Sequence, residues 1–261
     1  MATVQLSLEL LLAGFAGGML GAALGALPAF SLAGVVIVVG EIVGATVRTD
    51  TVDDAIEVFG VNGAPLDAVG LTGALGFGPP LGPHVAFAGG VAAAAYLGRK
   101  ETFDTTFRYH QAKNIATPLG SDPDVLLVGG AFGALGVVIA RLAAANAPVD
   151  PIALAIVVSG FLHRLALGYP LVGRVRNLSR SVLDMSPTAK WGQPGHETAQ
   201  GTGGRQVVEV WLPDHYEWGN VAVLGAGVGL AAGYIALVSG SAFLAFGLAA
   251  ASLGVLAAGL Y

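Results

Sequence analysis

Apolar residues follow one another along this chain in long runs, which a few polar segments separate. A run of about 20 apolar residues is long enough to cross the hydrocarbon core of a bilayer as a helix. Such runs predict seven membrane-spanning helices: residues 8–27, 29–47, 83–98, 124–144, 151–168, 219–238 and 241–260. The pattern therefore predicts an all-α polytopic membrane protein with about seven transmembrane helices.

Composition points to the same class of protein. The 261 residues are 54% hydrophobic and only 11% charged, and their mean hydropathy is +0.73. Soluble domains carry about 25% charged residues, so this chain has too few charges to cover a water-facing surface. Its 40 glycines suit membrane helices, in which small residues let backbones approach closely. The chain has no cysteine, which excludes disulfides and thiolate chemistry.

Loop charges predict the orientation of the chain in a cell membrane. Loop 99–123 holds four Lys or Arg residues and loop 169–218 holds five, whereas loop 48–67 holds one Arg among five acidic residues. Lys and Arg are enriched in cytoplasmic loops, so the first two loops are expected inside and the third outside. The N-terminus is then outside and the C-terminus is cytoplasmic. Within loop 169–218, Arg174–Leu183 is expected to form a short helix, either amphipathic on the inner leaflet or solvated.

An internal repeat divides the chain. Residues 10–25 and 125–140 are identical at seven of sixteen positions, and residues 32–36 and 84–89 match 154–158 and 220–225 in the same order. The matches predict a first three-span unit over 1–98, the cytoplasmic loop 99–123, and a second unit over 124–238. Residues 239–261 then form an additional helix.

A unit of three spans must insert its second copy upside down, and the loop charges agree with that. Inverted repeats recur in transporters. The glycines of the first match keep the same spacing in both copies, and each set shares one helix face: Gly14, Gly18 and Gly21, and Gly129, Gly133 and Gly136. These faces are expected to pack the two repeats together. A homo-oligomer is also expected, although no residue specifies its order.

The stretch 76–84, GFGPPLGPH, interrupts the pattern because its prolines and glycines forbid a continuous helix. One interpretation is a re-entrant segment over 69–83 with a turn from Gly78 to Gly82 inside the membrane. Free N–H groups at the next helix start would then favour anions or polar groups, with His84 at this mouth. The alternative is an ordinary extracellular loop with an interfacial His84.

Two further residues are candidates for a polar site near the midplane. Glu41 lies slightly past the middle of the second span, and the repeat places it opposite His163 of the fifth span. Ionisable residues in spans usually face a bundle interior or a cavity, where a carboxylate and an imidazole could pass a proton or bind a cation. The alternatives are a Glu41 that reaches outward to the interface, and a His163 that anchors headgroups together with Arg164. Arg141 is interpreted as an anchor at the outer end of its span.

Other chemistry is not indicated. The clusters 196–197 and 214–217 contain metal-capable groups without a known ligand spacing, so they are interpreted as solvated loop and no metal site is predicted. The sequence contains no phosphate-binding loop with its lysine, nucleophile elbow or HExxH motif. An ATP-driven pump is therefore not indicated, and no cofactor is expected. An intramembrane enzyme is the weakest alternative, because Glu41, His84 and His163 do not amount to a nucleophile–base pair or a metal set.

The sequence thus favours an integral membrane channel or secondary transporter for a small solute or ion. The pathway residues expected are Glu41, His84, His163, Gly78 and Gly82. The alternative is a non-transporting structural or assembly protein whose glycine faces serve packing. The expected partners are the bilayer, further copies of the chain and the solute; no nucleic acid is expected. A polar cavity leading to Glu41 would favour transport over assembly.

Overall fold

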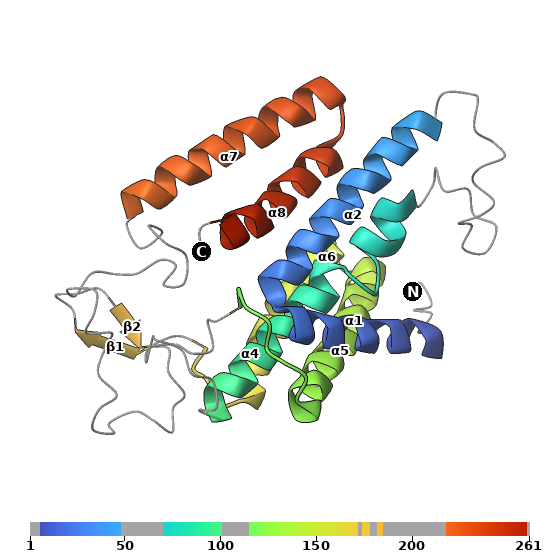
Figure 1. The fold of residues 1–261 in the computed structure, drawn as a ribbon. Helices are drawn as coiled ribbons and strands as arrows, with labels where there is room; N and C mark the ends of the chain where they lie inside the picture. Colours follow the sequence, from blue (N-terminus) through green and yellow to red (C-terminus); the bar gives the residue numbers. More distant parts are fainter. Residues whose placement is uncertain are drawn as a thin grey trace.

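The computed structural model describes residues 6–47, 70–100, 115–171, 174–177, 182–184 and 218–259. These residues form helices and one small β-ribbon (Figure 1). The helical elements are α1 (Leu8–Leu24), α2 (Ala26–Val47), η2 (Thr72–Gly76), η3 (Pro83–Phe87), α4 (Ala88–Lys100), α5 (Pro123–Asn146), α6 (Pro151–Ala166), α7 (Trp218–Ser239) and α8 (Ala242–Gly259). Both η elements are single π-helical turns.

The helices confirm the predicted class at a coarse level. Three are long and apolar enough to cross a membrane, over Ala26–Gly44, Pro123–Asn146 and Ala222–Ser239. Shorter apolar helices cover Leu8–Leu24, Pro151–Ala166 and Ala242–Ser252. Helices of this length and apolar composition are typical of a helical membrane protein.

The helix expected over 174–183 is wrong. The residues that the structure describes there form two antiparallel strands, β1 (Arg174–Asn177) and β2 (Val182–Asp184), with Arg174 opposite Asp184 and Val175 opposite Leu183. The sequence Arg-Val-Arg alternates polar and apolar residues with period two, and that period suits a strand. The other residues of the loop 169–218, apart from 169–171 and Trp218, lie outside the described parts of the chain, as does the acidic loop 48–67.

The centre of the fold is a close crossing of α1 and α5, with η3 and α4 packed against both. α6 packs against α5, and α8 lies along α2 (Figure 1). α7 is outermost and packs on α8. The repeat matched span six to span three, yet α7 does not occupy a place like that of α4, which packs among α1, α5 and α6.

Residues 70–100 run antiparallel along α2 as an interrupted helix. η2 lies beside the C-terminal half of α2, and η3 and the start of α4 lie beside its N-terminal half. Four neighbouring pairs mark this course: Gly40 with Thr72, Ile37 with Gly76, Phe30 with Phe87, and Ala26 with Gly90. The interruption at 77–82 therefore falls within the bundle, beside the middle of α2.

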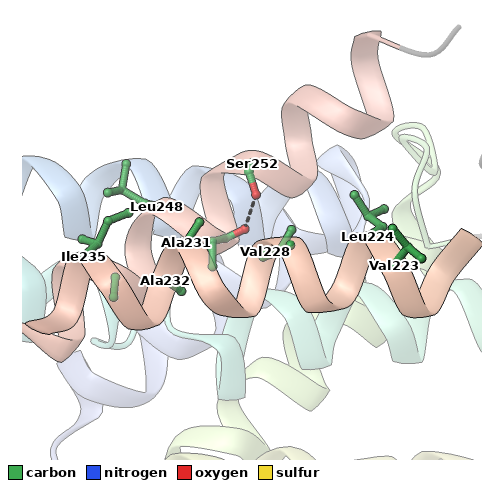
Figure 2. A pocket seen from close by; sticks show the side chains of 11 residues that line it. Val223, Leu224, Val228, Ala231, Ala232, Ile235, Leu248 and Ser252 are labelled. Atoms are coloured by element: carbon green, nitrogen blue, oxygen red, sulfur yellow. Dashed lines mark hydrogen bonds between the residues drawn. The ribbon is translucent and has the colours of Figure 1, made fainter.

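α7 presents an apolar surface that no other described element covers. None of its window Ala222–Ser239 is buried, and Leu230 and Leu237 are 77% and 85% exposed. An open, almost wholly apolar groove of about 530 Å³ separates it from α8 (Figure 2). Soluble monomers rarely expose apolar patches of this extent, so the surface suits contact with hydrocarbon.

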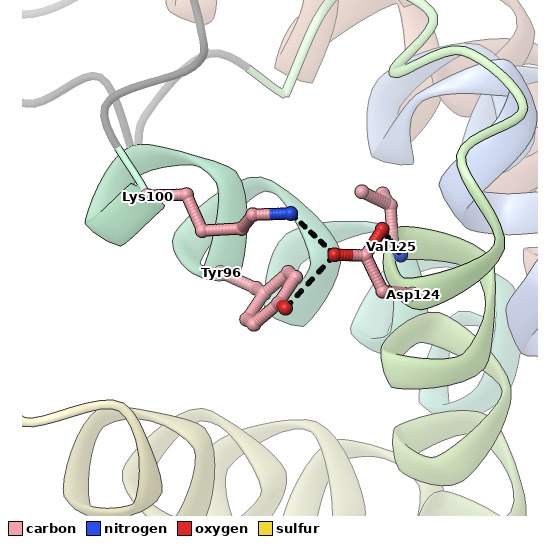
Figure 3. A network of polar contacts seen from close by, with 4 residues as sticks. All are labelled: Tyr96, Lys100, Asp124 and Val125. Carbon is pink, nitrogen blue, oxygen red and sulfur yellow. Dashed lines mark hydrogen bonds and ion pairs between the residues drawn. The ribbon is translucent and has the colours of Figure 1, made fainter.

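A polar cluster joins the end of α4 to the start of α5 (Figure 3). The Tyr96 hydroxyl donates to Asp124 Oδ2 at 3.0 Å, and the Lys100 ammonium forms an ion pair with the same carboxylate. The Lys100 Nζ also lies 5.2 Å from the centroid of the Tyr96 ring. Asp124 sits in the first turn of α5, where a negative charge complements the helix dipole. The cluster fixes where α4 ends against α5.

Tyr169 is expected to make stability fall at alkaline pH. Its buried hydroxyl donates to Ala95 O at 2.8 Å, and burial raises the pKa of its phenol from 10.0 to about 12. Because the folded state holds the proton more tightly, this contribution is complete below pH 10 and is lost as the pH rises toward 12. Melting temperatures across this range should fall more steeply for the wild type than for Tyr169→Phe. Parallel curves would contradict this prediction.

Candidate functional site

The candidate site begins at the break between η2 and η3. Residues 77–82 contain Pro79 and Pro80, which cannot donate backbone hydrogen bonds, and Pro83 starts η3. The Gly82 N–H donates to Gly78 O at 2.8 Å, and the N–H groups of Val85 and Ala86 both donate to Gly82 O, at 2.8 and 2.9 Å. These last two N–H groups are satisfied within the turn, so they are not free to bind an anion as the sequence suggested.

Gly78 and Gly82 are required by the tightness of this turn. A Cβ atom on Gly82 would lie 2.6 Å from Gly78 O and 2.7 Å from Cε1 of His84, and one on Gly78 would collide with the carbonyl of Ala74. Both glycines therefore serve close backbone approach. Their carbonyl groups already accept hydrogen bonds within the turn.

α1 covers the break on one side. A Cβ atom on Gly17 would lie 2.7 Å from Pro79 O and would also collide with Pro80 O. The carbonyl groups of both prolines are thus pressed against the α1 backbone. They do not form an open ring of oxygens.

His84 follows the break directly and is only 5% exposed. Its backbone carbonyl lies against Gly136 of α5, and η3 also packs against α6. Its Nδ1 atom is buried and has no hydrogen-bond partner within the described part of the chain. The charged groups that act on it electrostatically are Arg141 and Asp150, which have opposite signs. His84 is therefore an interior residue and does not lie at an exposed loop surface.

His163 lies on the buried stripe of α6, which consists of Ala155, Ser159 and itself. Its ring meets Phe132 of α5 edge to face, with centroids 6.0 Å apart. It is 6% exposed, and its Nδ1 atom makes no hydrogen bond of normal geometry among the described residues, although the Ser159 carbonyl lies near enough to act on the ring. Arg164 faces elsewhere and donates to Pro170 O at 3.0 Å.

Ser159 is a site residue that the sequence reading missed. It is 0% exposed, and its Oγ atom is buried without a partner in the residues that the structure describes. The available signal was its spacing, since a serine four residues before His163 in an apolar helix shares that residue's face.

Glu41 is held by two hydroxyl groups from other elements. The Thr72 Oγ1 donates to its Oε1 at 2.9 Å, and the Ser241 Oγ donates to its Oε2 at 2.5 Å. Ser241 also accepts from the Leu244 N–H at 3.0 Å, which caps α8. Glu41 thereby ties α2 to η2 and to the start of α8.

Removal of the Ser241 hydroxyl is expected to loosen α8. Ser241→Ala loses both the helix cap and one hydrogen bond to Glu41, and caps alone are worth about 1 kcal/mol. We expect the free energy of unfolding to fall by about 1–2 kcal/mol on this basis. Denaturation in detergent measures the change, with Ser252→Ala as the control, because Ser252 bonds only within α8, to Ala249 O. Equal effects of the two variants would contradict a special role for Ser241.

The structure does not bring the three ionisable candidates together. Glu41 lies on α2 and His163 on α6; η3 packs against both helices, which make little or no contact with each other. No hydrogen bond or ion pair between described residues joins Glu41, His84 and His163. η3, which carries His84, packs against α6, whose buried face carries Ser159 and His163.

Both predicted glycine faces lie at the crossing of α1 and α5. A Cβ atom on Gly133 would lie 2.6 Å from Cα of Gly18, and one on Gly129 would lie 2.7 Å from Gly18 O. Gly14 in turn faces Gly133, so the two helices cross antiparallel. The outer members, Gly21 and Gly136, lie against the carbonyls of Ala86 and His84 in η3.

No group of three or more potential metal ligands occurs among the described residues.

Comparison with known proteins gives a match to a family model, which covers residues 1–261. The chain belongs to DUF7973. DUF7973 is a family of unknown function, so membership assigns no activity to the site. No curated protein and no solved structure matches the chain.

Proposed function

We propose that this member of DUF7973 is a channel or secondary transporter for a small solute, with its path beside the break at 77–82. The observation that carries the proposal is a set of buried polar atoms without hydrogen-bond partners in the described chain. They belong to His84, which follows the break, and to Ser159 and His163 of α6, against which η3 packs. Unwound backbone within a membrane bundle is tolerated where protein or a water-filled cavity satisfies it. Discontinuous helices of this kind form the substrate sites of many transporters.

Energetics favour transport over a purely structural role. A buried polar group left without a partner costs about 1–3 kcal/mol, and three such groups lie around η3 and α6. A protein that served only packing could carry apolar side chains of similar volume at these positions and be more stable. Ser31 of α2 is a fourth such group but stands apart from these three, so the proposal rests on their occurrence on two packed elements, where a polar molecule that binds transiently would satisfy them.

The proposal includes an inverted repeat, but one of two helices against two and not of three spans against three. Reciprocal contacts support it: Gly14 faces Gly133 as Gly129 faces Gly18, and Gly21 and Gly136 meet the two carbonyls of η3. We propose that α1–α2 and α5–α6 are the related pairs, with η3–α4 between them. α7 and α8 are then additions outside the symmetric unit.

The proposed topology has the N-terminus outside, the C-terminus in the cytoplasm, and the break at membrane depth. Cysteines at Asp53 and Gln193, which both lie outside the described residues, should label from opposite sides of intact cells. A cysteine at Leu81 should label more slowly than one at Asp53. If Leu81 labels as freely as Asp53, the break is an outer loop and not a re-entrant segment.

A non-transporting assembly protein is the second candidate. In that case further copies of the chain, and not hydrocarbon alone, would cover the exposed apolar face of α7. The two candidates differ in flux. The purified chain, reconstituted in liposomes, should carry at least one member of a panel of potassium, sodium, chloride, protons, urea, glycerol and ammonia faster than protein-free liposomes do. If no member exceeds that background, the transport proposal fails and the assembly role stands.

A homo-oligomer remains a prediction, which the mass of the particle in lipid nanodiscs tests.

A further inference from the structure

His84 lies on η3, which packs against α5 and α6, and Ser159 and His163 lie on the buried face of α6. α5 and α6 are joined by the short connection 147–150, so they run antiparallel. The backbone carbonyl of His84 meets α5 at Gly136, and the ring of His163 meets it at Phe132. These two positions are about 6 Å, or one helical turn, apart along α5. On α6, Ser159 lies one turn before His163, and because α6 is antiparallel to α5 this brings it to the height of Gly136 on α5. Ser159 therefore lies near the level of the His84 backbone, one turn from His163.

The charged groups near this region are engaged or balanced. Glu41 is held by hydroxyl groups on the far side of η3, and Arg164 donates to a backbone carbonyl. Arg141 and Asp150, which act on His84, carry opposite charges. Arg164 also acts electrostatically on His163, but no carboxylate or cation of the described residues forms an ion pair or hydrogen bond with the three polar atoms.

Four of the six carbonyl groups of the break are engaged or covered. Gly78 O and Gly82 O accept hydrogen bonds within the turn, and the two proline carbonyls press against Gly17. Ion selectivity sites are built from rings of free carbonyls or of charged side chains, and this region offers neither. A bare ion here would lose its hydration without compensation, which is strongly unfavourable in a low-dielectric interior.

We propose that His84, Ser159 and His163 form a binding site for a small uncharged solute that both donates and accepts hydrogen bonds, such as urea, glycerol or ammonia. This inference rests on the proposed transport function and names its solute class. An imidazole nitrogen and a hydroxyl group can each present a donor or an acceptor. Three such groups satisfy an uncharged polar molecule and are themselves satisfied by it, which removes their desolvation cost while the solute is bound.

The test measures permeability of proteoliposomes that contain the full chain, with gradients of urea, glycerol and ammonia in one set and of potassium, sodium and chloride in another. We expect flux above the protein-free background for at least one uncharged probe and for none of the ions. Ser159→Ala should lower that flux about tenfold, since one hydrogen bond is worth about 1.4 kcal/mol. Ser159→Thr, which keeps the hydroxyl, should restore much of it.

Ser31→Ala is the matched control, because Ser31 is also a buried serine whose Oγ lacks a partner among described residues, but it lies on α2. Its flux should equal that of the wild type. If Ser159→Ala and Ser31→Ala have the same flux, the site is overturned while transport stands. Flux of ions alone overturns the uncharged solute class and leaves the transport proposal intact. Absence of flux for every probe overturns both.

Discussion

Gly133→Leu is expected to destroy the fold of the bundle, or to lower its free energy of unfolding by about 3 kcal/mol or more. Overpacking of a well-packed core costs about 1–3 kcal/mol and occasionally more, and the obstacle here is backbone. A Cβ atom at this position would lie 2.6 Å from Cα of Gly18 and 2.8 Å from its N atom. α1 and α5 would have to separate, and η3 packs against both of them.

Gly229→Leu provides the matched control. Gly229 lies in α7, another long apolar helix, and a Cβ atom there has nothing within 4 Å. The substitution introduces the same side chain and the same gain in helix propensity without a collision. Thermal unfolding and the particle size in detergent should be close to wild type for Gly229→Leu and severely altered for Gly133→Leu. Similar behaviour of the two variants would show that the crossing of α1 and α5 is not a tight backbone contact.

The positions of the helices were predictable because apolar runs and prolines act locally. The runs placed α2, α5 and α7, and Pro79, Pro80 and Pro83 marked where the helix beside α2 must stop and restart. The ribbon of β1 and β2 was not predictable in the same way. A short segment such as Arg174–Asn177 satisfies a helical and an alternating pattern equally well, and the pairing of β1 with β2 decided between them.

The partners of the site residues were not predictable, because they come from distant parts of the chain. Ser241 is 200 residues from Glu41 in sequence, and no periodicity links a helix cap to a carboxyl group on another helix. The role expected for Glu41 at a shared interior with His163 came from the repeat alone, and the repeat did not anticipate that η3 would lie between α2 and α6. Ser159 was overlooked because a single serine in an apolar helix most often bonds to its own backbone.

His84→Leu is expected to raise stability and abolish transport at the same time. The wild-type ring buries an Nδ1 atom without a partner in the described chain, and replacing an unsatisfied polar group by an apolar one of similar volume removes a cost of about 1–3 kcal/mol. The melting temperature should therefore rise, or at least not fall. The same change removes a hydrogen-bonding group beside the break, so flux should drop to the protein-free background.

A rise in stability combined with a loss of flux distinguishes a functional histidine from a structural one. If His84 only supported the packing of η3 between α1 and α5, its loss would lower stability, and flux would fall no further than the amount of folded protein. Ser31→Ala gives the reference, since it should raise stability slightly with no change in flux. Melting curves and urea or ion flux from the same preparations of the three proteins decide the matter. A destabilised His84→Leu protein with proportionate flux would remove His84 from the proposed pathway.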